Sequence, residues 1–175
     1  MLTDREKTWK TAFKAMFALL EDWKNNDPDL CRRLPTRIFY EAVGKTKTGY
    51  KSKKATRKSA ETTDDHFAIP QWIGRFIMDN GDIYLTDFEK FKEICIFAAQ
   101  TIKVTKKENK MLSLQTSTIA EIDGINTFIE TSIKDKYDKA GILLWSDKEG
   151  YLDEFPIEIP QEILDYEKPY LAEPN

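Results

Sequence analysis

The spacing of apolar residues near the N-terminus constrains the fold of this chain more than any other feature. Large apolar side chains recur at intervals of three and four over residues 4–26: Trp9, Phe13, Met16, Leu20 and Trp23. This is the period of one face of an α-helix, which must be buried against other elements. We therefore interpret the tryptophans as core residues rather than ligand-binding residues, and we expect a largely helical core.

The composition indicates a globular chain without a membrane-spanning segment. Of its 175 residues, 41% are hydrophobic, which is enough for a core without disulfide or metal cross-links. The apolar runs "AMFALL" and "ICIFAA" are too short to cross a bilayer, and the first residues lack a signal-peptide pattern. We therefore expect a cytoplasmic protein. Cys31 and Cys95 are far apart and are expected to be reduced thiols, with Cys95 buried on a helix.

Local patterns predict a mixture of helices and strands. "TIKVT" and "AGILLW" are typical of strands, and "DDHFAIP" is expected to be a short extended segment that ends at Pro70. Thr86 with Glu89, and Thr105 with Glu108, have the spacing of helix capping boxes. We predict one compact, mainly helical α+β domain around a small strand pair. Its expected parts are an N-terminal helical part at 1–44, a central part at 45–116, and a C-terminal helical part with an acidic, proline-containing tail at 117–175.

A basic segment at residues 45–58 is the strongest indication of a partner. It contains seven lysines and arginines and no acid, although the whole chain has a net charge of −3. Such a run is typical either of a solvated loop or of a surface that contacts a phosphate backbone. Tyr50 within it would stack on a base or anchor a hairpin. The expected nucleic-acid contacts are Lys45, Lys47, Tyr50, Lys51, Lys53, Lys54, Arg57, Lys58 and Arg75.

The only histidine of the chain, His66, follows two aspartates in "TTDDHFAIP". Most isolated histidines are structural, but imidazole also accepts a proton near neutral pH. The adjacent carboxylate of Asp65 is a good oxygen ligand for Mg²⁺. Asn109 lies in the first turn of the helix expected after "TIKVT", where its amide oxygen would complete a metal site if that helix packs against the strand of His66.

The string "DDHFAIP" followed by the Asn-bearing helix "TKKENKML" resembles the HNH endonucleases, also called ββα-metal or His-Me finger nucleases. The resemblance covers residues 60–115. It implies that His66 is the general base, that Asp65 and Asn109 hold one Mg²⁺ or Mn²⁺ ion, and that double-stranded DNA is cut. Asn80 is the competing second ligand, although "DNG" is equally explained as a turn. The resemblance also makes a homodimer an expected state, and the chain looks like a phage-encoded protein, which would act in the host cytoplasm.

Two alternatives stay open. Glu108 and Lys110 form an E-x-K pattern of carboxylate–lysine nucleases, with Asp82 or Asp64 as partner, but Glu108 is already explained by the capping box. The second alternative is a non-catalytic nucleic-acid-binding or protein-interaction module in which His66 is structural. Gly44-Lys45-Thr46 lacks the upstream glycine of a phosphate-binding loop, so nucleotide hydrolysis is not expected.

Overall fold

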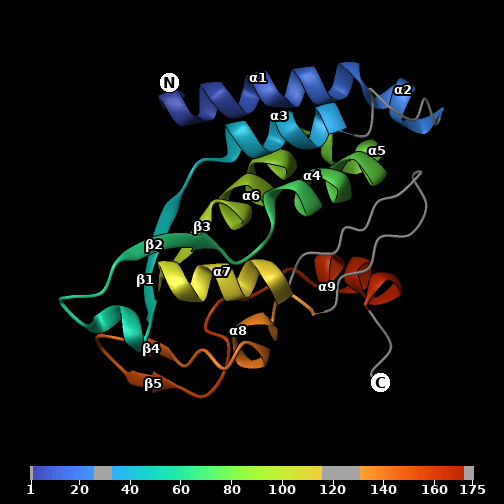
Figure 1. Ribbon diagram of the computed structural model, residues 1–175. Coiled ribbons are helices and arrows are strands. Elements are labelled where there is room, and N and C mark those ends of the chain that lie inside the picture. Colours follow the sequence, from blue (N-terminus) through green and yellow to red (C-terminus); the bar gives the residue numbers. More distant parts are fainter. Residues whose placement is uncertain (1, 26–32, 116–130, 172–175) are drawn as a thin grey trace. The chain divides into compact units, whose positions relative to one another are not determined.

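The computed structural model describes residues 2–25, 33–115 and 131–171, and its helices and strands are labelled in Figure 1. The chain divides into two compact units. Unit 1 contains the described parts of 1–46 and 68–100, and unit 2 contains those of 47–67 and 101–175. Residues 68–100, which the sequence analysis grouped with the central part, thus belong with the N-terminal helices. Within the described ranges, no helix is long and apolar enough to cross a membrane.

Unit 1 is built from helices. They are α1 (Asp4–Ala18), α2 (Leu20–Lys24), α3 (Arg33–Val43), α4 (Pro70–Asp79), α5 (Gly81–Tyr84) and α6 (Phe88–Ala98). The predicted helix at 4–26 is present as α1 and α2, which are separated at Leu19. Helix α3 packs against α1 and α4, and the core includes Trp9, Met16, Phe39, Trp72 and Phe91. Cys95 is buried as expected, whereas Cys31 lies outside the described residues.

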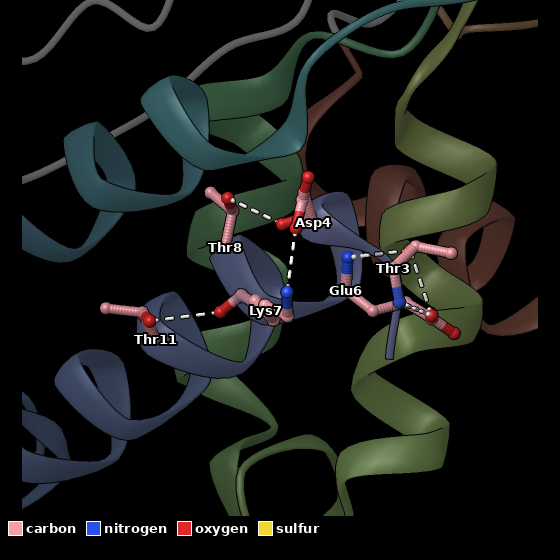
Figure 2. A network of polar contacts seen from close by, with 6 residues as sticks. All are labelled: Thr3, Asp4, Glu6, Lys7, Thr8 and Thr11. Carbon is pink, nitrogen blue, oxygen red and sulfur yellow. Dashed lines mark hydrogen bonds and ion pairs between the residues drawn. The ribbon is translucent and has the colours of Figure 1, made fainter. Parts of the chain in front are cut away.

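The start of α1 is fixed by a capping box (Figure 2). The backbone N–H of Glu6 donates to Thr3 Oγ1 at 3.2 Å, and the Glu6 carboxylate accepts from the backbone N–H of Thr3 at 2.8 Å. Lys7 and Asp4 form an ion pair at 2.8 Å along the same turn. The two capping-box hydrogen bonds satisfy backbone N–H groups that have no helical partner at the start of a helix, so the helix begins here.

Two boundaries in unit 1 differ from the prediction. Helix α6 is capped by Asp87, whose carboxylate accepts from the backbone N–H of Glu89 at 2.9 Å, and not by Thr86. The Thr86 hydroxyl instead donates to the Asp82 carbonyl oxygen. The "DNG" segment is the junction of α4 and α5 rather than a reversing turn, because the Asn80 amide donates to the Phe76 carbonyl at 2.9 Å and ends α4.

Unit 2 contains most of a five-stranded sheet, in place of the small strand pair that was predicted. Its strands are β1 (Thr46–Ser52), β2 (Thr62–His66), β3 (Gln100–Thr105), β4 (Leu144–Ser146) and β5 (Gly150–Leu152), in the order β2-β3-β1-β4-β5. The pairs β2/β3, β1/β4 and β4/β5 are antiparallel. The sheet is larger than expected because part of the basic segment forms β1, an inner strand between β3 and β4.

The inner residues of β3 are buried except at Lys103. Ile102 and Val104 are fully buried on one face, and Thr101 is buried on the face of the exposed Lys103. Helix α7 (Lys106–Gln115) contacts β2, and its predicted capping box is confirmed, since Thr105 Oγ1 accepts from the Glu108 N–H and Glu108 accepts from the Thr105 N–H. The Ser52 hydroxyl also donates to the buried Glu108 at 2.6 Å, which fastens α7 to β1.

The remaining elements of unit 2 are short. They are η1 (Lys54–Thr56), α8 (Lys136–Lys139), α9 (Gln161–Glu167) and η2 (Lys168–Tyr170). The first residues of the predicted C-terminal helical part, 117–130, lie outside the described residues. The α+β class is confirmed. Part of the acidic tail forms α9, whose residues Ile163 and Glu167 are buried.

Candidate nucleic-acid interface

The basic segment crosses β1 and continues into the loop that joins β1 to β2. Two of its strand lysines face acids: Lys47 Nζ lies 4.0 Å from Asp64 Oδ2, and Lys51 Nζ lies 2.5 Å from Asp147 Oδ2. The hydrogen bond from Lys51 lowers the pKa of Asp147 below its ordinary value. These two cations are therefore partly neutralised within the protein.

The loop at residues 53–61, which we call the basic loop, carries cations of a different kind. Lys54, Arg57 and Lys58 are exposed, and none of them forms an ion pair with any residue that the structure describes. The backbone N–H of Lys106 donates to the Glu61 carbonyl at 2.9 Å, which places the start of α7 beside the loop. The exposed Lys107 of α7 adds to the positive charge there. Cations that are not engaged in ion pairs are those that attract a polyanion most strongly.

An aromatic pair lies next to this loop on the β4–β5 hairpin. Trp145 and Tyr151 are cross-strand partners, with ring centroids 5.1 Å apart and planes at 83°. Lys53 Nζ lies 3.5 Å from the centroid of the Trp145 ring and 4.9 Å from that of Tyr151. The backbone N–H of Lys53 donates to the Leu143 carbonyl at 2.8 Å, so loop and hairpin are joined directly.

The aromatic pair was missed in the sequence. "WSDKEGY" contained the signal, because a tight turn between two aromatic residues makes them cross-strand neighbours on one sheet face. That the pair adjoins the basic loop could not be read from the sequence, since some 90 residues separate Lys53 from Trp145 and only the pairing of β1 with β4 brings them together.

The structure gathers some predicted nucleic-acid contacts and separates others. Lys47, Tyr50, Lys51, Lys53, Lys54, Arg57 and Lys58 all belong to unit 2, whereas Lys45 and Arg75 belong to unit 1. Arg75 Nε lies 3.6 Å from Asp79 Oδ2 on α4, so its charge is matched locally. Tyr50 is half-buried within β1, and the more exposed ring of this region is Tyr151.

Asp65 is held in a buried polar cluster with α8. Its Oδ2 accepts from the Tyr137 hydroxyl at 2.6 Å and lies 2.8 Å from Lys136 Nζ, which also donates to the His66 carbonyl oxygen at 2.9 Å. The Lys136 side chain is 3% exposed. Burial lowers the pKa of Lys136, with the Asp65 charge acting in the opposite direction, and burial together with Asp65 raises the pKa of Tyr137 well above its ordinary value.

His66 and Asp65 leave opposite faces of β2, because neighbouring side chains alternate along a strand. Asp65 pairs with the buried Ile102, while His66 pairs with Thr101 and so shares the face of Lys103. Asn109 lies on α7, which contacts β2, so all three predicted nuclease residues belong to unit 2. Asn80 and Asp82 belong to unit 1. Glu108 is occupied by its hydrogen bonds to Ser52 and Thr105, and Asp64 faces Lys47.

A divalent ion does not fit Asp65 as the side chain stands. The carboxylate is already neutralised by a buried ammonium group, which a metal ion would have to displace. Among the described residues, no three His, Cys, Asp or Glu side chains form a metal-binding group. Comparison with protein-family models, with curated proteins and with solved structures finds no match to this chain.

Proposed function

We propose that this protein binds nucleic acid through the basic loop and the adjoining β4–β5 hairpin. One observation carries the proposal: the exposed cations of the loop continue, through Lys53, onto an aromatic pair of which Tyr151 is exposed. Cations supply affinity for phosphates by releasing condensed counterions, and aromatic rings supply faces for bases. A basic loop that was only solvated would not require an exposed aromatic ring beside its cations.

The loop and not the whole molecule supplies the attraction in this proposal. The chain carries a net charge of −3, so its overall charge repels a polyanion. Lys54, Arg57 and Lys58 lie within five residues, and the ion pairs nearest them in the sequence, Lys51 with Asp147 and Lys106 with Glu61, use other cations. These three side chains are therefore expected to make the phosphate contacts.

The test is binding of a fluorescently labelled oligonucleotide, followed by anisotropy. The triple variant Lys54→Gln, Arg57→Gln, Lys58→Gln is expected to bind at least about ten-fold more weakly, since each lost phosphate contact also removes its share of counterion release. The control changes three exposed lysines of unit 1, Lys10→Gln, Lys14→Gln and Lys90→Gln, with the same change in net charge. Equal affinities of the two triple variants would contradict the proposal.

A second candidate function is the Mg²⁺- or Mn²⁺-dependent DNA endonuclease expected from the HNH resemblance. The observation that favours it is the element order: β2 carrying Asp65 and His66 pairs with β3, and α7 carrying Asn109 follows and contacts β2. The ion pair between Asp65 and Lys136 argues against this candidate, because it occupies the carboxylate that would bind the metal ion. On this candidate, His66 would accept the proton of the attacking water.

The endonuclease is tested with supercoiled plasmid, each metal ion, and an EDTA control. Nicking that requires the metal and is abolished by His66→Ala, with the melting temperature unchanged, would establish it. Under those conditions an Asn109→Ala variant should lose activity while Asn80→Ala keeps it. Light scattering of the same samples measures whether the active species is the homodimer. Loss of stability in His66→Ala without any cleavage by the unmodified protein would assign His66 a structural role.

A further inference from the structure

We infer that the ligand is a single-stranded nucleic acid and that one of its bases stacks on Tyr151. This inference rests on the proposed function and adds the class of ligand and the contact that selects it. Tyr151 is 54% exposed, so its ring is open to contact with a base. Among the described residues it is the most exposed aromatic ring.

The ring of Tyr151 is exposed but held in position. Trp145 meets it at 83°, so the two rings do not stack face to face and do not cover each other fully. The turn between them is ordered, because Ser146 Oγ accepts from the backbone N–H groups of Lys148 and Glu149, and Gly150 takes a positive φ of 85°. A ring that is already ordered loses little conformational entropy when a base binds.

Lys53 places a positive charge over one face of the same ring, so a base would stack on the opposite face. Its Nζ lies 4.9 Å from the Tyr151 centroid, within reach of the phosphate of a nucleotide whose base is stacked there. The exposed acids Asp153 and Glu154 directly follow β5 and would repel a phosphate backbone. The strand is therefore expected to run from the hairpin toward Lys54, Arg57 and Lys58, and away from the end of β5.

This arrangement selects single strands because a duplex keeps its base faces stacked on one another. A protein ring can receive a base only from an unpaired strand, and such stacking tolerates any base since every base has a π-face. Single-stranded DNA and RNA share this chemistry. The loop cations by themselves would bind duplex and single strand alike.

The experiment compares Tyr151→Leu, Tyr151→Phe and a matched control, Tyr40→Leu, at a half-exposed tyrosine of α3. The probes are labelled deoxythymidine and uridine 12-mers and a DNA duplex of equal length. Tyr151→Leu is expected to weaken binding of the single strands about ten-fold, as for the loss of one stacked base, without changing the salt dependence. Tyr151→Phe and Tyr40→Leu should bind like the unmodified protein, and the duplex should bind at least ten-fold more weakly than the single strands.

The outcomes separate this inference from the proposed function. If Tyr151→Leu binds single strands normally, or if the duplex binds as tightly, base stacking on Tyr151 is wrong, while loss of binding in the basic-loop triple variant would still uphold nucleic-acid binding. If the unmodified protein binds none of the three probes, both the base-stacking inference and the proposed nucleic-acid binding are wrong. Far-ultraviolet circular dichroism of each variant shows that its fold is intact.

Discussion

At the scale of single residues, the pairing of Asp65 with Lys136 decides how the histidine motif is interpreted. A carboxylate directly before a histidine suggests a metal ligand when only the sequence is seen. In the folded chain that carboxylate accepts from Tyr137 and faces a buried ammonium group. A buried charge without its partner is costly, so this contact has a structural consequence that can be measured.

We predict that Lys136→Met destabilises the protein by roughly 3–5 kcal/mol, because it leaves the Asp65 carboxylate, whose side chain is 14% exposed, without its counter-ion. The double variant Asp65→Asn, Lys136→Met should recover a large part of this loss, since the amide is neutral and still accepts from Tyr137. Urea unfolding of both single variants and the double variant measures the coupling. Additive effects would show that the pair does not contribute as a unit.

Glu167 predicts a pH dependence of stability. It is buried and accepts from the backbone N–H of Ile133 at 3.0 Å, and burial raises its pKa from 4.5 to about 7, with Asp135 adding to the rise. Because the folded pKa is the higher one, the folded state binds more protons between these values. This contribution is complete below pH 4.5 and is lost as the pH rises through about 7.

Glu167→Gln should remove this dependence, because the amide stays neutral and its oxygen still accepts from Ile133. The rise in pKa corresponds to on the order of 3 kcal/mol, so the variant should be more stable than the unmodified protein at pH 8 by an amount of that order, and equally stable at pH 4.5. Urea unfolding between pH 4.5 and 8 makes the comparison. Parallel stability curves for the two proteins would contradict the assigned pKa.

At the scale of elements, the helix caps show where sequence patterns are reliable and where they are shifted. Both capping boxes predicted from Thr and Glu spacing lie at true helix starts, but α6 uses Asp87 one residue later. Asp and Thr are both good N-caps, so "TD" is ambiguous to within one residue. Only the folded structure distinguishes the two residues, because the Thr86 hydroxyl donates to the Asp82 carbonyl oxygen and is not used as a cap.

We predict that Asp87→Ala costs about 1 kcal/mol of stability, the typical value of an N-cap side chain. Thr86→Ala, the adjacent control, should cost less than about half of that, because its hydroxyl does not cap the helix. Thermal or urea unfolding of the two variants is sufficient. A larger loss of stability in Thr86→Ala than in Asp87→Ala would show that Thr86 is the N-cap of α6.

At the scale of the whole molecule, charge distribution matters more than net charge. The nine acids of residues 147–175 offset the basic segment in the sum. In the structure, part of this acid meets the segment locally, as in the contact of Asp147 with Lys51, and part lies in α9. Lys54, Arg57 and Lys58 form no ion pair with any described acid, so positive charge is concentrated at the loop although the net charge of the chain is negative.

This distribution predicts the salt dependence of oligonucleotide binding. The logarithm of the binding constant of the unmodified protein should fall linearly with the logarithm of salt concentration, with a slope that reports the number of phosphate contacts, about 0.7 per contact for single strands. The basic-loop triple variant should lose up to about two units of that slope. The unit 1 control should keep the full slope, and a reduced slope in the control would assign the contacts to the whole surface.

Much of the fold was contained in local patterns. The 4–26 periodicity, the strand "TIKVT", the stop at Pro70 and the Thr105–Glu108 box were confirmed because each depends on residues close in the sequence. The size of the sheet was underestimated, because β1 is rich in lysine and is a strand only by virtue of its pairing with β3 and β4. Nuclease chemistry, metal binding, DNA as partner and a cytoplasmic location remain predictions.

The sequence by itself determined the helical periods, the caps and the charge of the basic segment, since these follow from backbone geometry and residue chemistry over a few positions. Only the tertiary structure decided which residues that charge would meet. The pairing of β1 with β4 brings Lys53 to Trp145 and Tyr151, and the packing of α8 brings Lys136 and Tyr137 to Asp65. Both contacts join residues 70 or more positions apart, a separation across which no local pattern specifies a neighbour.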